Sequence, residues 1–184
     1  MQYLVQMSLV KGAMDPRAVF GISILMSLVS SVIIVMLFAW PWLRTMNRND
    51  ALVRLVAPHM FLRFIGLSFI VPGVVSPHLP SAFAIPAAWG DFTAGVLAII
   101  ATIGLSHRTV WAIAAVWFFN IEGALDLLFA FIEGARVQLN PGDLGAAFFI
   151  VTAIVPPLLV SHALVFRLLT VKHDRTTAGG KEFE

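Results

Sequence analysis

Five long apolar stretches, separated by short polar segments, make up most of this sequence and restrict its fold more than any other feature. About 20 consecutive apolar residues are enough for a helix to cross roughly 30 Å of hydrocarbon. We expect such helices at residues 18–40, 57–75, 82–105, 110–132 and 144–170. The sequence therefore predicts an all-α membrane protein whose domain, residues 18–170, is a bundle of five transmembrane helices.

The composition supports this interpretation. Of the 184 residues, 59% are hydrophobic and 12% are charged, whereas charged residues make up about 25% of a soluble globular domain. Cysteine is absent, which excludes disulfides, thiolate metal sites and cysteine nucleophiles. No run of Lys and Arg with interleaved aromatic residues is present. We therefore expect the lipid bilayer, and no nucleic acid, as a partner.

Polar or interrupted segments flank and divide the apolar stretches. Gly12 and Pro16 break the short apolar stretch near the N-terminus, so we expect residues 1–17 to form an interfacial segment. Residues 171–184 are charged and contain glycine, which predicts a flexible cytoplasmic tail. Within the domain, we interpret residues 44–54 as a polar loop between the first two helices.

Two adjacent prolines lie near the middle of the fifth predicted helix, at Pro156 and Pro157. A proline inside a helix removes one backbone hydrogen bond and clashes with the preceding turn. The sequence therefore predicts a bend or a local unwinding of this helix between residues 155 and 160.

The distribution of basic residues predicts the orientation of the bundle. With five spans, eight of the twelve Lys and Arg residues fall on the side of the C-terminus, three fall on the side of the N-terminus, and Arg63 lies within a span. Cytoplasmic loops carry the excess of Lys and Arg in membrane proteins. We therefore expect the N-terminus outside and the C-terminus in the cytoplasm.

Three carboxylates lie inside the predicted spans, at Asp91, Glu122 and Asp126. A charge at membrane depth costs at least about 2.5–3.5 kcal/mol, so it marks a functional site by default. Glu122 and Asp126 are four residues apart and share one helix face. Asp91 belongs to a face of small residues that should pack on another helix, namely Ala84, Ala87, Ala88, Ala94, Gly95, Ala98 and Ala101.

The loop at residues 106–109 is short, so spans three and four should be antiparallel neighbours. Asp91 and Asp126 are then expected to meet in the outer half of the membrane, within one water or one shared proton. Arg63 has two interpretations: its side chain extends to the nearby interface, or it pairs with a carboxylate of another helix. The two possibilities predict opposite burial of its guanidinium group.

These groups could form a ladder through the bundle, from Asp91 and Asp126 through Glu122 and Asn120 to His162 and Arg63. Several carboxylates cannot all be ionised together in a low dielectric, so at least one should hold a proton near neutral pH. Such a set suits a proton relay or a cation site. The structural alternative is that these groups only join helices by hydrogen bonds, which average about 0.6 kcal/mol in membranes.

No cofactor is predicted, and two chemical alternatives remain open. Haem b could lie between His59 and His162, which are both toward the inner side. A divalent metal could bind to carboxylates with one histidine, at Asp91, Glu122, Asp126 and His162. No glycine-rich phosphate loop, Ser-His-Asp arrangement or nucleotide fingerprint is visible, so the sequence gives no direct sign of an enzyme.

Four short pieces between residues 60 and 165 resemble a group of small, largely uncharacterised bacterial multi-pass proteins. The pieces are Arg63 with Gly66; the stretch 83–87 leading into Gly90, Asp91 and Gly95; Asn120 with Gly123, Asp126 and Leu127; and Pro156 followed by His162. Glu122 is not part of this pattern. The resemblance implies a bundle in the bacterial inner membrane and brings no known activity.

The first functional hypothesis is passage or proton-coupled transport of a small solute or cation through the carboxylate site. Five short spans enclose little volume, so a homo-oligomer or a larger membrane complex is expected. Two hypotheses of other classes remain beside it. One is a non-catalytic membrane subunit that binds a partner or lipid through the small-residue face, and the other is a metal- or haem-dependent membrane enzyme.

Overall fold

The protein is described by a computed structural model that covers residues 15–171. Within this range the chain is mostly helical and forms no strand. Five helices are long and apolar enough to cross a membrane: Pro16–Leu43, Arg48–Ile70, Ser81–Ser106, Ala112–Arg136 and Ile150–Thr170. The predicted all-α architecture with five spans is thus confirmed. Most of the interfacial segment expected at 1–17 and nearly all of the tail expected at 171–184 lie outside the described residues.

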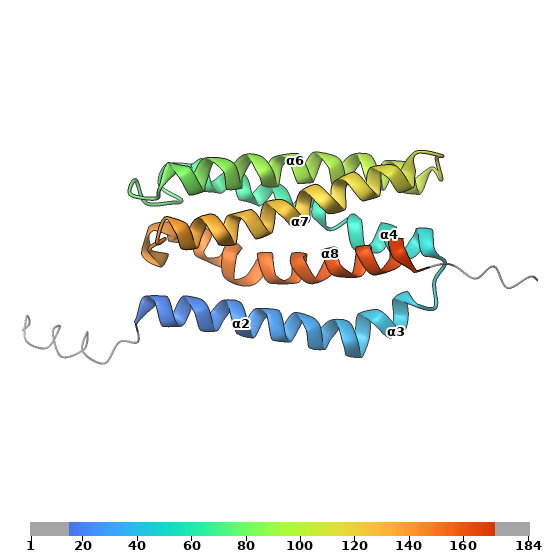
Figure 1. The fold of residues 1–184 in the computed structure, drawn as a ribbon, viewed down its shortest axis with the longest axis horizontal. Coiled ribbons are helices and arrows are strands. Elements are labelled where there is room, and N and C mark those ends of the chain that lie inside the picture. Colours follow the sequence, from blue (N-terminus) through green and yellow to red (C-terminus); the bar gives the residue numbers. More distant parts are fainter. Residues whose placement is uncertain (1–14, 172–184) are drawn as a thin grey trace, which may run out of the picture.

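The helices run up and down along one axis, and the two ends of the described chain lie at opposite ends of the bundle (Figure 1). Helices α6 (Ser81–Ser106) and α7 (Ala112–Arg136) form an antiparallel hairpin, as the short loop predicts. The 3₁₀ segment η2 (Arg63–Ile70) packs on α6, α8 (Val155–Thr170) lies beside α7, and α2 (Pro16–Ile34) lies outermost against α8.

The small-residue face of α6 is buried along its whole length, as predicted. Small side chains let the backbones of α7 and η2 approach closely. The apolar core has two large clusters along this axis and a small third one: the first includes Phe83, Leu127 and Val155, the second includes Leu52 and Phe119, and the third includes Leu43. Along their helices, the buried Asp91 and Asn120 lie between residues of the two large clusters.

The prediction of a polar loop at 44–54 is wrong, because most of this segment belongs to the helix α4 (Arg48–Val56). The side chain of Asn47 caps the helix and accepts a hydrogen bond of 2.9 Å from the backbone N–H of Asp50. One face, with Leu52 and Val56, is fully buried. The apolar residues on this single face were too few to stand out from the charged ones in the sequence.

Two π-helical turns each precede a proline. Val35–Ala39 comes before Pro41, and Ile150–Ile154 comes before Pro156. A proline leaves the carbonyl four residues earlier without its donor, so the wider turn forms on the N-terminal side. The distortion expected at residues 155–160 therefore lies one turn earlier, and α8 is a regular α-helix from Val155 onward.

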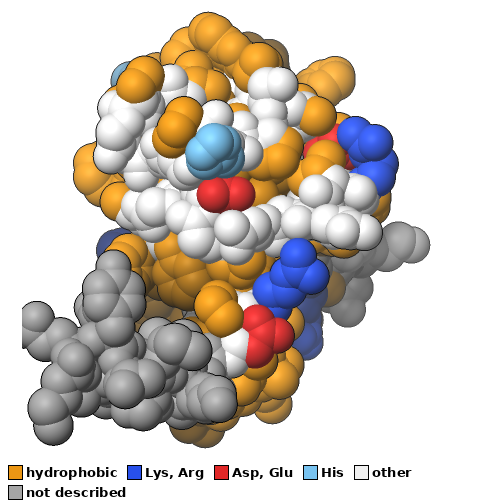
Figure 2. Space-filling view, turned by 90° about the vertical axis from the view of Figure 1, so that its left-hand side faces the viewer, with side chains coloured by type: hydrophobic (Ala, Val, Ile, Leu, Met, Phe, Trp, Pro, Cys, Tyr) orange, Lys and Arg blue, Asp and Glu red, His pale blue; other side chains and the backbone are white. Residues whose placement is uncertain are grey.

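The fifth span begins at Ile150 and not at residue 144 as predicted. Before it, the 3₁₀ segment η3 (Pro141–Ala147) folds back against the loop at residues 71–79, and the backbone N–H of Ala146 donates a 3.0 Å hydrogen bond to the Val74 carbonyl. Gly145 has a φ of +52°, and a Cβ here would collide with that carbonyl. This packing covers part of one end of the bundle, which Figure 2 views directly.

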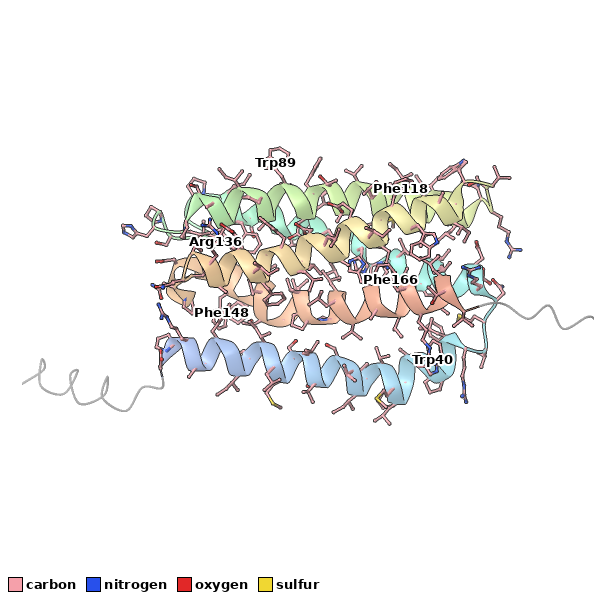
Figure 3. All side chains as sticks on the ribbon, viewed as in Figure 1. Trp40, Trp89, Phe118, Arg136, Phe148 and Phe166 are labelled. Atoms are coloured by element: carbon pink, nitrogen blue, oxygen red, sulfur yellow. The ribbon has the colours of Figure 1, made fainter. Side chains whose placement is uncertain are left out.

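The outer surface of the bundle is apolar, as expected for contact with lipid. Figure 3 shows Trp89 pointing away from the helices, and 54% of its surface is exposed. Exposed aliphatic and aromatic side chains also cover most of α2, which has no buried residue. The exposed apolar surface and the buried polar groups give the bundle the polarity expected of a membrane protein.

Candidate functional site

Arg63 is the centre of the buried polar cluster. Its side chain is fully buried, and its Nη1 donates to Asp91 Oδ1 at 2.6 Å and to Asp126 Oδ2 at 2.8 Å. The guanidinium therefore pairs with carboxylates of α6 and α7 and does not extend to the interface. The two aspartates do approach each other across the hairpin, as expected, but the guanidinium group joins them in place of a shared proton.

The second terminal nitrogen of the guanidinium, Nη2, connects the cluster to α8. Arg63 Nη2 donates to the Gly123 carbonyl and lies 3.0 Å from His162 Nε2. Since the arginine can only donate, this nitrogen of His162 accepts. His162 Nδ1 then carries the hydrogen and donates to Asn120 Oδ1 at 2.8 Å, while Asn120 Nδ2 donates to the His162 carbonyl at 3.2 Å. The network thus defines a neutral histidine of one tautomer.

Three glycines make room for these contacts. A Cβ at Gly66 would overlap the carboxylate of Asp91, and a Cβ at Gly90 would overlap that of Asp126. At Gly123 it would lie 2.7 Å from the His162 ring. Each glycine therefore lets one charged or aromatic side chain lie directly against a helix backbone, which brings three helices to one guanidinium.

A second layer, which the sequence interpretation did not assign to the site, follows on the side away from the carboxylates. His59 Nε2 lies 3.1 Å from Ser161 Oγ, which donates to the Leu55 carbonyl at 3.2 Å. The His59 ring packs edge-on against His162 and Phe119, with centroids 4.6 and 5.0 Å away. The sequence suggested His59 only as a possible haem ligand opposite His162, and the other signal for this layer was the position of Ser161 beside His162.

A cavity of 520 Å³ reaches the carboxylates from the opposite side. Asp91 and Asp126 line it together with apolar side chains, and the exposed Arg17 and Gln138 lie at its mouth. The mouth is at the end of the bundle where α6 begins, and Asp91 lies about 15 Å along α6 from that end at 1.5 Å per residue. Figure 2 shows hydrophobic side chains between the polar groups of this end.

A family model matches residues 19–170 of the chain. The chain belongs to the family described as a domain of unknown function, DUF8737. The matched range contains every residue of the cluster around Arg63. No curated protein sequence and no solved structure gives a significant match. The activity must therefore be argued from the site itself.

Glu122 has no place in the hydrogen-bond network of this DUF8737 chain. It is half-buried on α7, and its Oε2 is enclosed without a hydrogen-bond partner among the described residues. The expected ladder, in which Glu122 links the aspartates to Asn120 and His162, does not form. Arg63 makes that link, because its long side chain crosses from η2 into the space between α6, α7 and α8.

The geometry does not suit either chemical alternative. The rings of His59 and His162 touch each other, and each Nε2 already has a partner, so no porphyrin iron fits between them. For a metal, Arg63 fills the space between the two aspartates and His162. Within residues 15–171, no group of three or more His, Asp or Glu side chains is arranged to hold a metal ion.

Proposed function

We propose that this chain is a multi-pass protein of the bacterial inner membrane that carries a small solute or cation across the bilayer in exchange for protons. One observation supports this most directly. Two buried carboxylates share one guanidinium, and the neighbouring His162 is neutral in its hydrogen-bond network. The cluster therefore has one formal negative charge in excess, and an uncompensated charge is costly in a low dielectric.

Either a proton or a monovalent cation can compensate this charge, but the two compete for the same carboxylates. Such competition is what couples the movement of a cation to the movement of protons. Two other ionisable groups lie beside the cluster. Glu122 is one helical turn from Asp126 on α7, and the ring of His59 on α5 (His59–Leu62) packs on His162.

A cavity reaches the carboxylates from one side of the cluster, and this arrangement favours a carrier that is open on that side. The cavity leads to Asp91 and Asp126 from the end of the bundle near Arg17. On the other side, Arg63 and the packed rings of His59, Phe119 and His162 separate the carboxylates from the opposite end. With the N-terminus outside, this arrangement corresponds to a state open to the periplasm.

The alternative of a non-catalytic subunit finds less support. It would bind its partner through the small-residue face of α6, but α7 and η2 cover that face within the chain itself. A purely structural cluster is also less well supported, because interhelical hydrogen bonds alone contribute about 0.6 kcal/mol each. A purely structural role of the cluster also does not explain the cavity that ends at its carboxylates.

Proton exchange in proteoliposomes tests the proposal. Vesicles with an acidic interior and an enclosed pH dye receive external Na⁺, tetramethylammonium or guanidinium. At least one of these cations should raise the internal pH in the presence of the protein, and Asp126→Asn should abolish this response. The matched control is Asp50→Asn at an exposed carboxylate. The proposal fails if none of the cations gives a protein-dependent change, or if Asp126→Asn responds like the wild type.

A further inference from the structure

We infer that the cavity beside Asp91 and Asp126 binds a small hydrophobic amine, with its ammonium group on the carboxylates and its apolar body among the aromatic side chains. This inference rests on the proposed function and names the class of substrate for the same site. It follows from three features of the cavity: unused acceptor atoms, apolar walls and a basic residue at the mouth.

The first feature is that each aspartate keeps one oxygen free of hydrogen-bond donors. Asp91 uses Oδ1 and Asp126 uses Oδ2 to accept from Arg63. The second oxygens lie against the backbones of Gly66 and Gly90, and the structure gives no donor for either of them within the described part of the chain. Asp91 is 6% exposed, and the side chain of Asp126 is 9% exposed. An ammonium group supplies three N–H donors and one positive charge, which satisfies both the free oxygens and the excess negative charge.

The second feature is the apolar wall. The remainder of the cavity is formed mainly by rings and branched side chains from α2, η2, α6, α7 and η4 (Ile150–Ile154), including Phe20, Phe69, Phe83, Phe131 and Val151. Its 520 Å³ falls within the range of small-molecule sites, about 300–1,000 Å³. A hard divalent cation takes six or more oxygen ligands, waters included. Among the described residues that line the cavity, apart from the two aspartates, only Gln138, at its mouth, has a side-chain oxygen atom.

The third feature concerns the far end of the ligand. Arg17 lies at the mouth of the cavity, opposite the carboxylates, together with the amide side chain of Gln138. A second positive group on the ligand would point toward Arg17 and be disfavoured. The cavity therefore fits a monoamine better than a diamine, while the excess negative charge of the cluster disfavours a carboxylic acid.

Three ligands of one shape test the inference: 2-(1-naphthyl)ethylamine, 2-(1-naphthyl)ethanol and 1-naphthylacetate. Each is titrated calorimetrically into the full chain in lipid nanodiscs, and empty nanodiscs correct for partition into lipid. The amine should bind saturably with one site per chain, and the alcohol and the acid should bind at least tenfold more weakly. Equal binding of the amine and the alcohol, or preference for the acid, would overturn the inference.

Two variants separate the charge from the shape of the site. Asp126→Asn should weaken amine binding at least tenfold and leave the alcohol unchanged, whereas Ala130→Phe fills the cavity and should weaken both. Asp50→Asn should change neither. Helix content and thermal unfolding show whether each variant is folded. If Asp126→Asn does not fold, Ala130→Phe decides alone, and unchanged amine binding by this variant would refute the site.

The two proposals fail in different ways. If Na⁺ or guanidinium drives proton exchange but the naphthyl amine does not bind, the substrate class is wrong and the exchange function stands. If the amine binds as expected but none of the three cations drives protein-dependent proton exchange, the binding site stands and the carrier is wrong.

Discussion

At the scale of single residues, the molecule depends on one guanidinium that serves several partners. Arg63 neutralises one of two buried carboxylate charges and donates to α7 and α8 as well. A lysine could not replace it, because an ammonium is a point charge without the planar fork that reaches four acceptors. The cluster is therefore expected to act as a unit, so that its members affect stability non-additively.

Arg63→Met should destabilise the protein by about 3–5 kcal/mol, because it leaves two buried carboxylates without their counter-charge. Asp91→Asn added to this variant should recover part of the loss, since it removes one of the unpaired charges. Denaturant unfolding in detergent gives the four free energies of this double-mutant cycle. Strictly additive effects would show that the two side chains do not interact.

Gly123→Ala should destabilise the protein by about 1–3 kcal/mol, the usual cost of overpacking. The new Cβ would lie 2.7 Å from the His162 ring and 2.9 Å from Arg63 Nη2. Gly21→Ala on α2 is the matched control, because nothing lies within 4 Å of a Cβ there. Thermal unfolding of both variants provides the comparison, and similar behaviour would argue against close packing at Gly123.

At the scale of elements, contacts near both ends of the first span fix its position in the bundle. The first span is anchored near its end by two cation–π contacts: Arg54 lies 5.0 Å from the Trp42 ring, and Arg167 lies 3.9 Å from the Trp40 ring. At the other end, Phe20 packs on Phe148 with centroids 5.5 Å apart. These contacts place α2 as one wall of the cavity although it has no buried residue.

The element η3 depends on Gly145, which has a positive φ and lies against the Val74 carbonyl. Gly145→Ala should therefore cost at least about 1–3 kcal/mol from backbone strain and should loosen the connection to α8. Gly142→Ala in the same segment is the control, because a Cβ there meets only the Asn140 side chain at 3.7 Å. Amide hydrogen exchange of residues 141–147 measures the effect, and equal exchange in the two variants would contradict it.

At the scale of the whole molecule, the two ends of the bundle differ in charge. The segment 44–56, the loop at 107–111 and the end of α8 lie at the end where the described chain finishes, and they carry Arg44, Arg48, Arg54, Arg108 and Arg167. The start of α2 and the end of α7, with Arg17 and Arg136, lie at the other end. Membrane proteins keep the more basic end in the cytoplasm. In the proposed orientation, the cavity, which opens near Arg17, faces outward.

A reporter fused to Glu184 tests this orientation. A reporter that is active only in the cytoplasm should be active in this fusion, and one that is active only in the periplasm should be silent. The reverse pattern would place the cavity mouth in the cytoplasm and would reverse the proposed direction of access.

The sequence by itself determined the number and type of the spans, the small-residue face of α6 and three of the buried polar residues, Asp91, Asn120 and His162. These features depend on local quantities, namely the transfer cost of each side chain and its position on a helix. Only the tertiary structure decided which groups meet. It joined Arg63 to both aspartates, excluded Glu122, added His59 and Ser161, and left a cavity beside the carboxylates. Pairing depends on which helices come into contact and on the three glycines that let side chains lie against a neighbouring backbone. The spacing of residues along one helix encodes neither the helix contacts nor the close approach at these glycines.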